Sequence, residues 1–233
     1  MKAVKSAFIN KKRIFAFRTR EQFLDFINEE KKILIALNAE KLTKEEERLT
    51  QLINDNIGYP DGIGAVLALK RKGIKAIKIP GAEFWLDIIE CYQKSKSFYL
   101  IGATQEVMDL TVRKLQVEFP EIKLAGFRNG FLKEGDTQKL IADFQSAKPD
   151  LVFVAMGSPK QEFLMAEFSK AYPCLYMGLG GSFDVYSGHK KRAPITYQKL
   201  GLEWFYRLVK EPTRISRQLN LIKFFFKIIF GSI

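Results

Sequence analysis

A glycine-rich segment followed by a run of basic residues is the part of this sequence best suited to chemistry. Residues 177–194 read M-G-L-G-G-S-F-D-V-Y-S-G-H-K-K-R-A-P. Glycines let a backbone approach a phosphate closely and point its N–H groups at it. The basic run supplies positive charge for a second anionic group. The segment therefore indicates a site for a ligand that carries more than one phosphate.

One carboxylate, Asp61, stands at the predicted start of a helix. Asp61 precedes Gly62, and a helical pattern begins at the next residue. An acid in this place is either a turn residue that the helix dipole favours, or a general base or acceptor of a substrate hydroxyl. Composition alone leaves both interpretations open.

Several chemistries are disfavoured by residue types and motifs that the sequence lacks. It has a single histidine, His189, so His-based metal sites and Ser-His triads are poorly supported. We find no D-x-D pair to hold a metal on a nucleotide diphosphate, and no G-x-x-x-x-G-K-S/T phosphate loop. Gly178 and Gly180 match half of the dinucleotide-binding fingerprint, but Phe183 stands where its third glycine belongs. An NAD enzyme is therefore a weak candidate.

Apolar runs alternate with helical patterns along most of the chain. The predicted strands are Ile33–Leu37, Ile74–Ile79, Ser97–Ile101, Ile122–Ala125, Leu151–Met156 and Cys174–Met177. The predicted helices are Leu42–Asp55, Ile63–Lys72, Glu83–Lys94, Gln105–Glu118, Thr137–Ala147 and Gln161–Ala171. This alternation predicts an α/β fold, with a Rossmann-like, mostly parallel sheet that carries helices on both faces. We assign residues 1–194 to this core and residues 195–233 to a C-terminal helical appendage.

Candidate ligand-binding residues follow the predicted strands, because ligands of open parallel sheets bind beyond the carboxyl ends of the strands. These residues are Asn38 after the first strand, Gly102 and Thr104 after the third, Phe131 after the fourth, Gly157, Ser158 and Gln161 after the fifth, and Gly180, Gly181 and Asp184 after the sixth. We expect the ligand to bind at this end of the sheet.

The C-terminal segment combines positive charge with apolar residues. From His189 to the end there are ten Lys or Arg and two acids, which leaves this segment with eight of the twelve net positive charges. One helix is predicted over Thr196–Lys210, and a second, opening at Pro212, carries nine apolar residues between Leu219 and Phe230. This run is too short for a bilayer span, which needs ~20 apolar residues. The pattern favours a helix on an anionic membrane surface. The alternative is a helix packed on the core or in a homo-oligomer.

Composition also limits the compartment and the class of partner. The two cysteines, Cys91 and Cys174, provide no disulfide framework and indicate a reducing, cytoplasmic compartment. The net charge of +12 also fits a nucleic-acid-binding protein. However, the aromatic residues of the basic tail are phenylalanines clustered beside isoleucines, which suit lipid better than base stacking. We therefore expect no nucleic-acid partner.

Several linked motifs give the sequence a resemblance to a known family. They are N-A-E-K at 38–41, Y-P-D-G-I at 59–63, G-A-E-F-W at 81–85, V-A-M-G-S-P-K-Q-E at 154–162, G-H-K-K-R-A-P at 188–194, and L-G-L-E-W-F-Y-R-L at 200–208 followed by P-T-R-I-S-R-Q-L. From Ile33 to Leu221 the chain resembles the WecG/TagA/CpsF glycosyltransferases. Its first and fifth motifs resemble the WecG branch most closely.

The resemblance implies an inverting transfer, without metal or cofactor, at the cytoplasmic face of the plasma membrane. The WecG branch moves N-acetylmannosaminuronic acid from a UDP donor to undecaprenyl-diphosphate-linked N-acetylglucosamine, in enterobacterial common antigen assembly. The alternative within the family is transfer of N-acetylmannosamine or glucose in the assembly of wall teichoic acid or capsule.

The resemblance also implies roles for individual residues. Asp61 is the expected general base, Asn38 is expected to hold the acceptor or the base, and Gln161 to contact the sugar or the nucleotide. Lys78, which stands where the family commonly has Arg, is the fourth residue expected to take part in catalysis. The residues after the third to sixth strands are the expected contacts of the UDP-sugar. The residues expected at the acceptor and its diphosphate are Lys191, Arg192, Arg207, Arg214 and Arg217.

Overall fold

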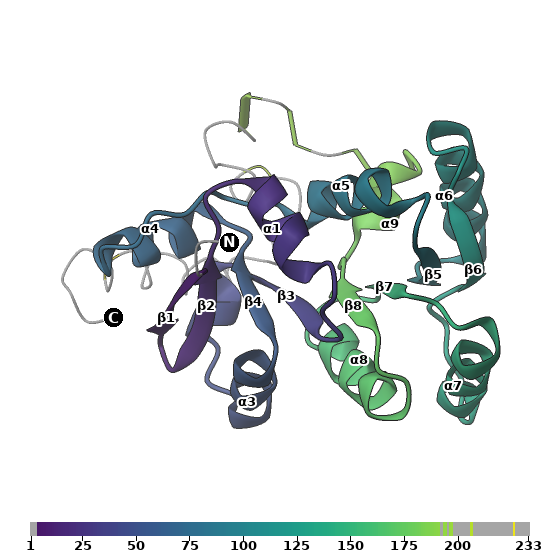
Figure 1. Cartoon of the computed structure of the whole chain (residues 1–233), viewed down its shortest axis with the longest axis horizontal. Coiled ribbons are helices and arrows are strands. Elements are labelled where there is room, and N and C mark those ends of the chain that lie inside the picture. Colours follow the sequence, from purple (N-terminus) through teal and green to yellow (C-terminus); the bar gives the residue numbers. More distant parts are fainter. Residues whose placement is uncertain (1–3, 192, 195, 198–205, 207–225, 227–233) are drawn as a thin grey trace. The chain divides into compact units, whose positions relative to one another are not determined.

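The computed structural model describes residues 4–191, 193–194, 196–197, 206 and 226 (Figure 1). Within these ranges the chain forms two compact units. The first takes in residues 4–20 and 36–80, together with the described residues from 191 onward. The second takes in residues 21–35 and 81–190.

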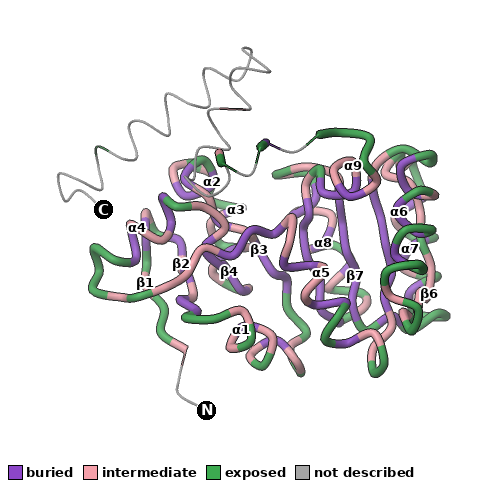
Figure 2. Tube along the Cα trace, turned by 90° about the horizontal axis from the view of Figure 1, so that it is seen from above, coloured by how far each residue is buried: buried purple, intermediate pink, exposed green. Residues whose placement is uncertain are grey.

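A six-stranded sheet runs in the order β4-β3-β8-β7-β5-β6. Its strands are β3 (Ile33–Leu37), β4 (Ile57–Pro60), β5 (Ser97–Gly102), β6 (Lys123–Arg128), β7 (Leu151–Ala155) and β8 (Leu175–Gly178). The pairs β3–β8, β8–β7, β7–β5 and β5–β6 are all parallel. Every residue of β7 is buried (Figure 2), as expected of a parallel strand with both faces covered. The predicted α/β fold with a mostly parallel sheet is confirmed.

Helices cover both faces of the strands in the second unit (Figure 1). They are α1 (Arg20–Ile27), α5 (Gly81–Tyr92), α6 (Gln105–Glu118), α7 (Asp136–Ala147), α8 (Lys160–Ala171) and α9 (Ser182–Tyr186). On one face, Trp85 of α5 makes edge contacts with Phe153 of β7 and Phe183 of α9. On the other face, Phe144 of α7 makes an edge contact with Tyr99 of β5. Aromatic side chains that alternate along the strands therefore fasten both helical layers to the sheet.

The first unit begins with an antiparallel hairpin of β1 (Lys5–Ile9) and β2 (Lys12–Ala16). Its turn places Asn10 and Lys11 at positive φ, 47° and 64°, which matches the twist of hairpin strands joined by two residues. The helices of this unit are α2 (Ala39–Thr43), α3 (Glu47–Asp55) and α4 (Ile63–Arg71). A Cβ at Gly58 of β4 would lie 2.6 Å from the Arg13 carbonyl oxygen and 2.6 Å from Leu37 Cδ1. Only glycine therefore allows this close approach.

Two of the predicted elements are wrong. The strand predicted over Ile74–Ile79 is irregular chain. The Ile77 N–H donates to Phe17 O at 2.9 Å and the Ile79 N–H donates to Pro60 O at 2.8 Å. Because these partners lie on different segments, no continuous ladder forms. The single helix predicted over residues 42–55 is instead α2 and α3, which an extended backbone at Lys44 separates.

Other elements were absent from the sequence-based prediction. These are the hairpin β1–β2, the helix α1, the strand β4 and the short helix α9. The strands among them have four or five residues, and α9 has five. Such lengths give too few residues for a period to stand out.

The predicted C-terminal appendage falls almost entirely outside the described residues. Its two helices, over residues 196–210 and from Pro212 onward, stay predictions. Among the helices in the described part of the chain, none has both the length and the apolar character that a membrane crossing requires.

Replacing Lys148 with glycine tests the C-terminal end of α7. Lys148 caps α7 with φ 49° and ψ 53°, a left-handed conformation that costs side-chain-bearing residues about 1 kcal/mol. We expect Lys148→Gly to raise the free energy of unfolding by about 0.5–1 kcal/mol. The control is Lys170→Gly inside α8, which should lower it by a similar amount. Urea unfolding measures the free energy of unfolding of both variants. If Lys148→Gly lowered it, the left-handed conformation of residue 148 at the end of α7 would be contradicted.

Candidate active site

The carboxyl ends of four strands in the second unit lie side by side. Gly102 of β5 pairs with Ala155 of β7, and β7 pairs in parallel with β8 up to Gly178. Just after β6, the Gly130 N–H donates to Ala103 O at 2.9 Å. The structure therefore brings the sequence-predicted residues that follow the third to sixth predicted strands to one edge of this unit.

The side-chain amide of Gln161 connects the loops that follow β7 and β8. Its Oε1 accepts hydrogen bonds from the backbone N–H groups of Gly157 at 3.1 Å and Gly180 at 2.9 Å. Its Nε2 donates to Glu162 Oε1 at 3.3 Å. Gln161 is 4% exposed. The amide therefore holds the two loops together, and its predicted contact with a sugar or nucleotide stays a prediction.

Three glycines make this arrangement possible. A Cβ at Gly178 would lie 2.4 Å from Gln161 Nε2, so a larger residue there would displace the amide. Gly157 and Gly180 have φ of 78° and 60°, a conformation that other residues adopt only under strain. The glycines that indicated a phosphate site in the sequence thus also shape the protein around Gln161.

The loop after β5 lies tightly against the end of β7. A Cβ at Gly102 would lie 2.3 Å from the Ala155 carbonyl oxygen, and Ala103 takes a positive φ of 54°. Thr104 then caps α6, because its Oγ1 accepts a hydrogen bond from the Val107 N–H at 3.3 Å. The positive end of the α6 dipole therefore faces this edge of the sheet.

The loop after β6 presents Phe131, whose residue surface is 70% exposed. The Phe131 N–H donates to Asn129 Oδ1 at 3.0 Å, and Asn129 Nδ2 donates to Gln105 Oε1 at 2.9 Å. Gln105 Nε2 in turn donates to Asp109 Oδ1 at 2.7 Å. This series of bonds fixes the orientation of both amides and holds an exposed aromatic ring at the edge where the glycine loops lie.

Asp136 anchors the other end of the same loop. Its carboxylate pairs with the Arg128 guanidinium and accepts a hydrogen bond from the Lys133 N–H at 2.8 Å. Lys139 Nζ lies 3.6 Å from Asp136 Oδ1. The Lys133 N–H, with the positive charges of Arg128 and Lys139, holds the pKa of Asp136 below its ordinary value. The carboxylate therefore stays ionised at neutral pH and keeps its bonds to Arg128 and to the Lys133 N–H.

The basic run folds back onto the glycine segment. Lys190 Nζ lies 3.3 Å from Asp184 Oδ1, and the Lys190 N–H donates to Asp184 O at 2.8 Å. The next residue, Lys191, is exposed. The predicted site residues Arg192, Arg207, Arg214 and Arg217 lie outside the described residues.

The first unit brings Asn38 and the Asp61–Gly62 pair together. The Asp61 N–H donates to Leu37 O at 3.1 Å, and a Cβ at Gly62 would lie 3.6 Å from Asn38 Cβ. Asn38 Oδ1 caps α2 by accepting a hydrogen bond from the Lys41 N–H at 2.9 Å. Gly62 caps α4, so Asp61 stands directly before a helix N-terminus, as predicted.

Lys78 lies on the irregular segment that runs beside Asp61. The N–H of Ile79, the residue after Lys78, donates to Pro60 O at 2.8 Å. Pro60 directly precedes Asp61, so this bond holds the segment of Lys78 next to that of Asp61. The structure thus gathers three of the four predicted catalytic residues, Asn38, Asp61 and Lys78, in the first unit. Gln161 belongs to the second unit.

Sequence reasoning missed Asn129, Gln105 and Asp136 as residues that shape the site. Asn129 and Gln105 meet through a tertiary contact between the loop after β6 and the start of α6. Asn129 directly follows β6, but the predicted strand ended at Ala125. The partners of Asp136 lie three to eight residues from it in sequence. Within the described ranges, no three His, Cys, Asp or Glu side chains gather as a metal-binding group would.

Replacing Gly178 with alanine tests whether the Gln161 amide needs this space. The new methyl group would lie 2.4 Å from Gln161 Nε2, so we expect the free energy of unfolding to fall by about 1–3 kcal/mol. The matched control is Gly181→Ala, because its Cβ would meet only Asp184 Oδ2, at 3.9 Å, and its φ is −102°. Urea unfolding followed by circular dichroism compares the two. Equal stabilities would show that the amide has room to move.

A comparison with protein families agrees with the motifs. The profile of the glycosyl transferase WecG/TagA/CpsF family matches residues 13–232, which include Asn38, Asp61 and Gln161. The match covers nearly the whole chain and confirms the resemblance at the level of the family. The chain belongs to the WecG/TagA/CpsF family and is a glycosyltransferase of surface polysaccharide synthesis.

Proposed function

We propose that this glycosyltransferase moves N-acetylmannosaminuronic acid from UDP to undecaprenyl-diphosphate-linked N-acetylglucosamine, with inversion and without a divalent metal. The observation that carries the proposal is the pairing of Asn38 with Asp61–Gly62 in the first unit. This pairing joins the two motifs in which the family resemblance expects the acceptor-activating groups.

The second unit is proposed to bind the donor. The N–H groups of Gly157 and Gly180 are bonded to Gln161. The neighbouring backbone N–H groups, those of Ser158 and Gly181, supply donors for the diphosphate, as glycine loops do for phosphates in other proteins. Thr104 stands at the N-terminal end of α6, whose dipole favours the same anion. The exposed ring of Phe131 offers a stacking surface for the uracil base, and Asp184 lies beyond the glycines for the sugar or ribose hydroxyls.

The first unit is proposed to activate the acceptor. Asp61 takes the proton of the acceptor hydroxyl, and Asn38 orients that hydroxyl or the carboxylate. The hydroxyl oxygen forms a bond to the anomeric carbon, while the bond from that carbon to the β-phosphate oxygen breaks and UDP leaves with the electron pair. Lys78, whose neighbour Ile79 is bonded to the residue before Asp61, is assigned to the same acceptor-activating group.

The C-terminal segment is proposed to hold the enzyme on the inner face of the plasma membrane. Its eight net positive charges attract anionic lipid, and its apolar run adds burial that salt does not screen. Within this segment, Lys191, Arg192, Arg207, Arg214 and Arg217 are assigned to the acceptor and its diphosphate.

A panel of donors tests the proposed reaction. UDP-N-acetylmannosaminuronic acid, UDP-N-acetylmannosamine and UDP-glucose are offered singly with the undecaprenyl-diphosphate-linked N-acetylglucosamine acceptor, and mass spectrometry identifies the product. We expect transfer from the uronic acid donor alone, at the same rate in excess EDTA. Transfer only from one of the other donors would establish a sister activity. Activity that EDTA abolishes and Mg²⁺ or Mn²⁺ restores would contradict the metal-free mechanism.

Replacing Asp61 with asparagine removes the proposed base while keeping its size. We expect turnover to fall roughly 10²–10⁴-fold, because the acceptor hydroxyl loses its proton acceptor. Asp55→Asn is the matched control in the same unit, at an exposed residue at the end of α3, and should keep normal turnover. Steady-state kinetics on the three proteins makes the comparison. An Asp61→Asn enzyme as fast as the control would remove Asp61 from this role.

A further inference from the structure

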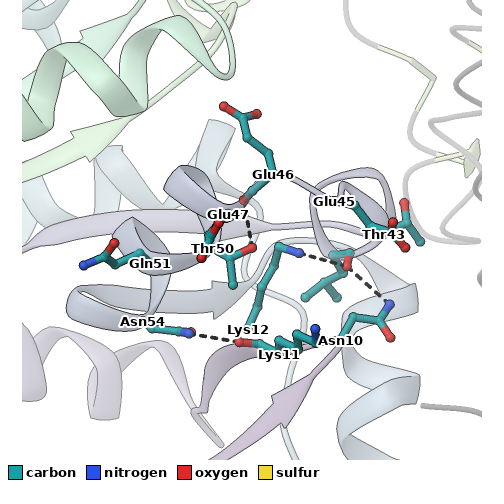
Figure 3. A pocket seen from close by; sticks show the side chains of 11 residues that line it. Asn10, Lys11, Lys12, Thr43, Glu45, Glu46, Glu47, Thr50, Gln51 and Asn54 are labelled. Carbon is teal, nitrogen blue, oxygen red and sulfur yellow. Dashed lines mark hydrogen bonds between the residues drawn. The ribbon is translucent and has the colours of Figure 1, made fainter.

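Lys12 is a buried cation in the first unit that the proposed mechanism does not use. It opens β2 and is 2% exposed, whereas lysines are almost never fully buried unless they are paired. Its Nζ donates to Lys44 O at 2.8 Å. It also donates to Leu42 O at 3.4 Å (Figure 3). The partners of this buried charge are therefore backbone carbonyl oxygens.

Those carbonyl oxygens lie at the C-terminal end of α2, where a helix leaves its last carbonyls without partners inside the helix. A positive charge is favoured there by the helix dipole. Asn10 supports the same contact, because its Nδ2 donates to Leu42 O at 3.3 Å (Figure 3). The hairpin β1–β2 thus holds the end of α2 with two side chains, one from its turn and one from the start of β2.

The opposite end of α2 carries Asn38. The helix has only five residues, so a shift at its C-terminal end reaches its N-terminal cap within little more than one turn. At that cap, Asn38 Oδ1 is bonded to the Lys41 N–H, and Asn38 lies beside the Asp61–Gly62 pair. Lys41 is itself 8% exposed, which leaves the helix little freedom to rotate on its own.

We propose that Lys12 is a positioning residue of the transfer reaction. By holding the carbonyl oxygens of Leu42 and Lys44, it fixes α2 and thereby sets Asn38 against Asp61. This inference rests on the proposed function, because it assigns Asn38 and Asp61 to acceptor activation.

The surroundings of Lys12 make its replacement compatible with folding. Lys12 lines a pocket of about 920 Å³ together with Thr43, Glu45 and Gln51 (Figure 3). Water that enters this pocket can hydrate the two carbonyl oxygens once the ammonium group is gone. Burial lowers the pKa of Lys12 from its ordinary value, with Glu45 acting in the opposite direction. The buried charge therefore favours the fold less than an exposed one would, and Lys12→Met should fold.

The test compares Lys12→Met with Lys11→Met, which removes the exposed neighbouring lysine, and with Lys12→Arg, which keeps a cation. With the full-length enzyme and the donor and acceptor of the proposed reaction, we expect Lys12→Met to lower kcat about 10–100-fold. The affinity for UDP should stay within about twofold, and Lys12→Arg should recover most of the loss. Lys11→Met should behave as the wild type.

Amide hydrogen exchange supplies a second readout that needs no turnover. Lys12→Met should speed exchange in the peptide that contains residues 38–44 and leave peptides of the second unit unchanged. The proposal would be overturned if the Lys12→Met enzyme had the same kcat and the same exchange rates as the Lys11→Met enzyme. It would also be overturned if Lys12→Met lowered the affinity for UDP by as large a factor as it lowered kcat. If Lys12→Met does not fold, Asn10→Ala replaces it and must show the same effects in weaker form, or the proposal is overturned.

A wild-type enzyme that transfers none of the UDP-sugars would instead refute the proposed function, and the exchange data would still decide whether Lys12 holds α2.

Discussion

The carbonyl oxygen of the Gln161 side chain accepts hydrogen bonds from the backbone N–H groups of Gly157 and Gly180. These bonds join the loops after β7 and β8 at a residue that is almost fully buried. A buried amide with its bonds satisfied holds its neighbours in one arrangement, because any other arrangement leaves polar groups unpaired. The remaining N–H groups of both loops are thereby fixed in direction, which is the preorganisation that an anion site needs.

The first unit uses the same kind of contact on a smaller scale. The short helix α2 is held at its N-terminal end by Asn38 and at its C-terminal end by Lys12, each through a bond between a side chain and the backbone. Asp61 is tied to β3 by its own N–H. In both units, polar side chains inside the protein orient backbone segments by bonding to their N–H or carbonyl groups. Acidic, amide and glycine residues at strand ends then become available for chemistry.

The sequence allowed the fold to be predicted wherever a pattern was long enough to have a period. The strands β5 to β8 and the helices α5 to α8 of the second unit were found in this way, whereas α1 and α9 were not. The place of Asp61 before α4 was also predicted. The hairpin β1–β2 was not predicted, because its strands are short. The strand predicted over Ile74–Ile79 was wrong, because the backbone bonding partners of this segment lie on separate parts of the chain. The hydrogen bonds of the Gln161 side chain were not predicted either, because one of its partners lies 19 residues away in the sequence. Nothing local marks Lys12, in a basic stretch, as buried.

Titration of UDP by calorimetry is the measurement that tests the division of roles between the two units most directly. The wild type is compared with Gln161→Leu, which loses the bonds to both glycine loops, and with Asp61→Asn in the first unit. We expect Gln161→Leu to weaken UDP binding about tenfold or more, and Asp61→Asn to keep the wild-type affinity within about threefold. The opposite pattern, with UDP binding lost in Asp61→Asn and kept in Gln161→Leu, would contradict the assignment of the donor to the second unit.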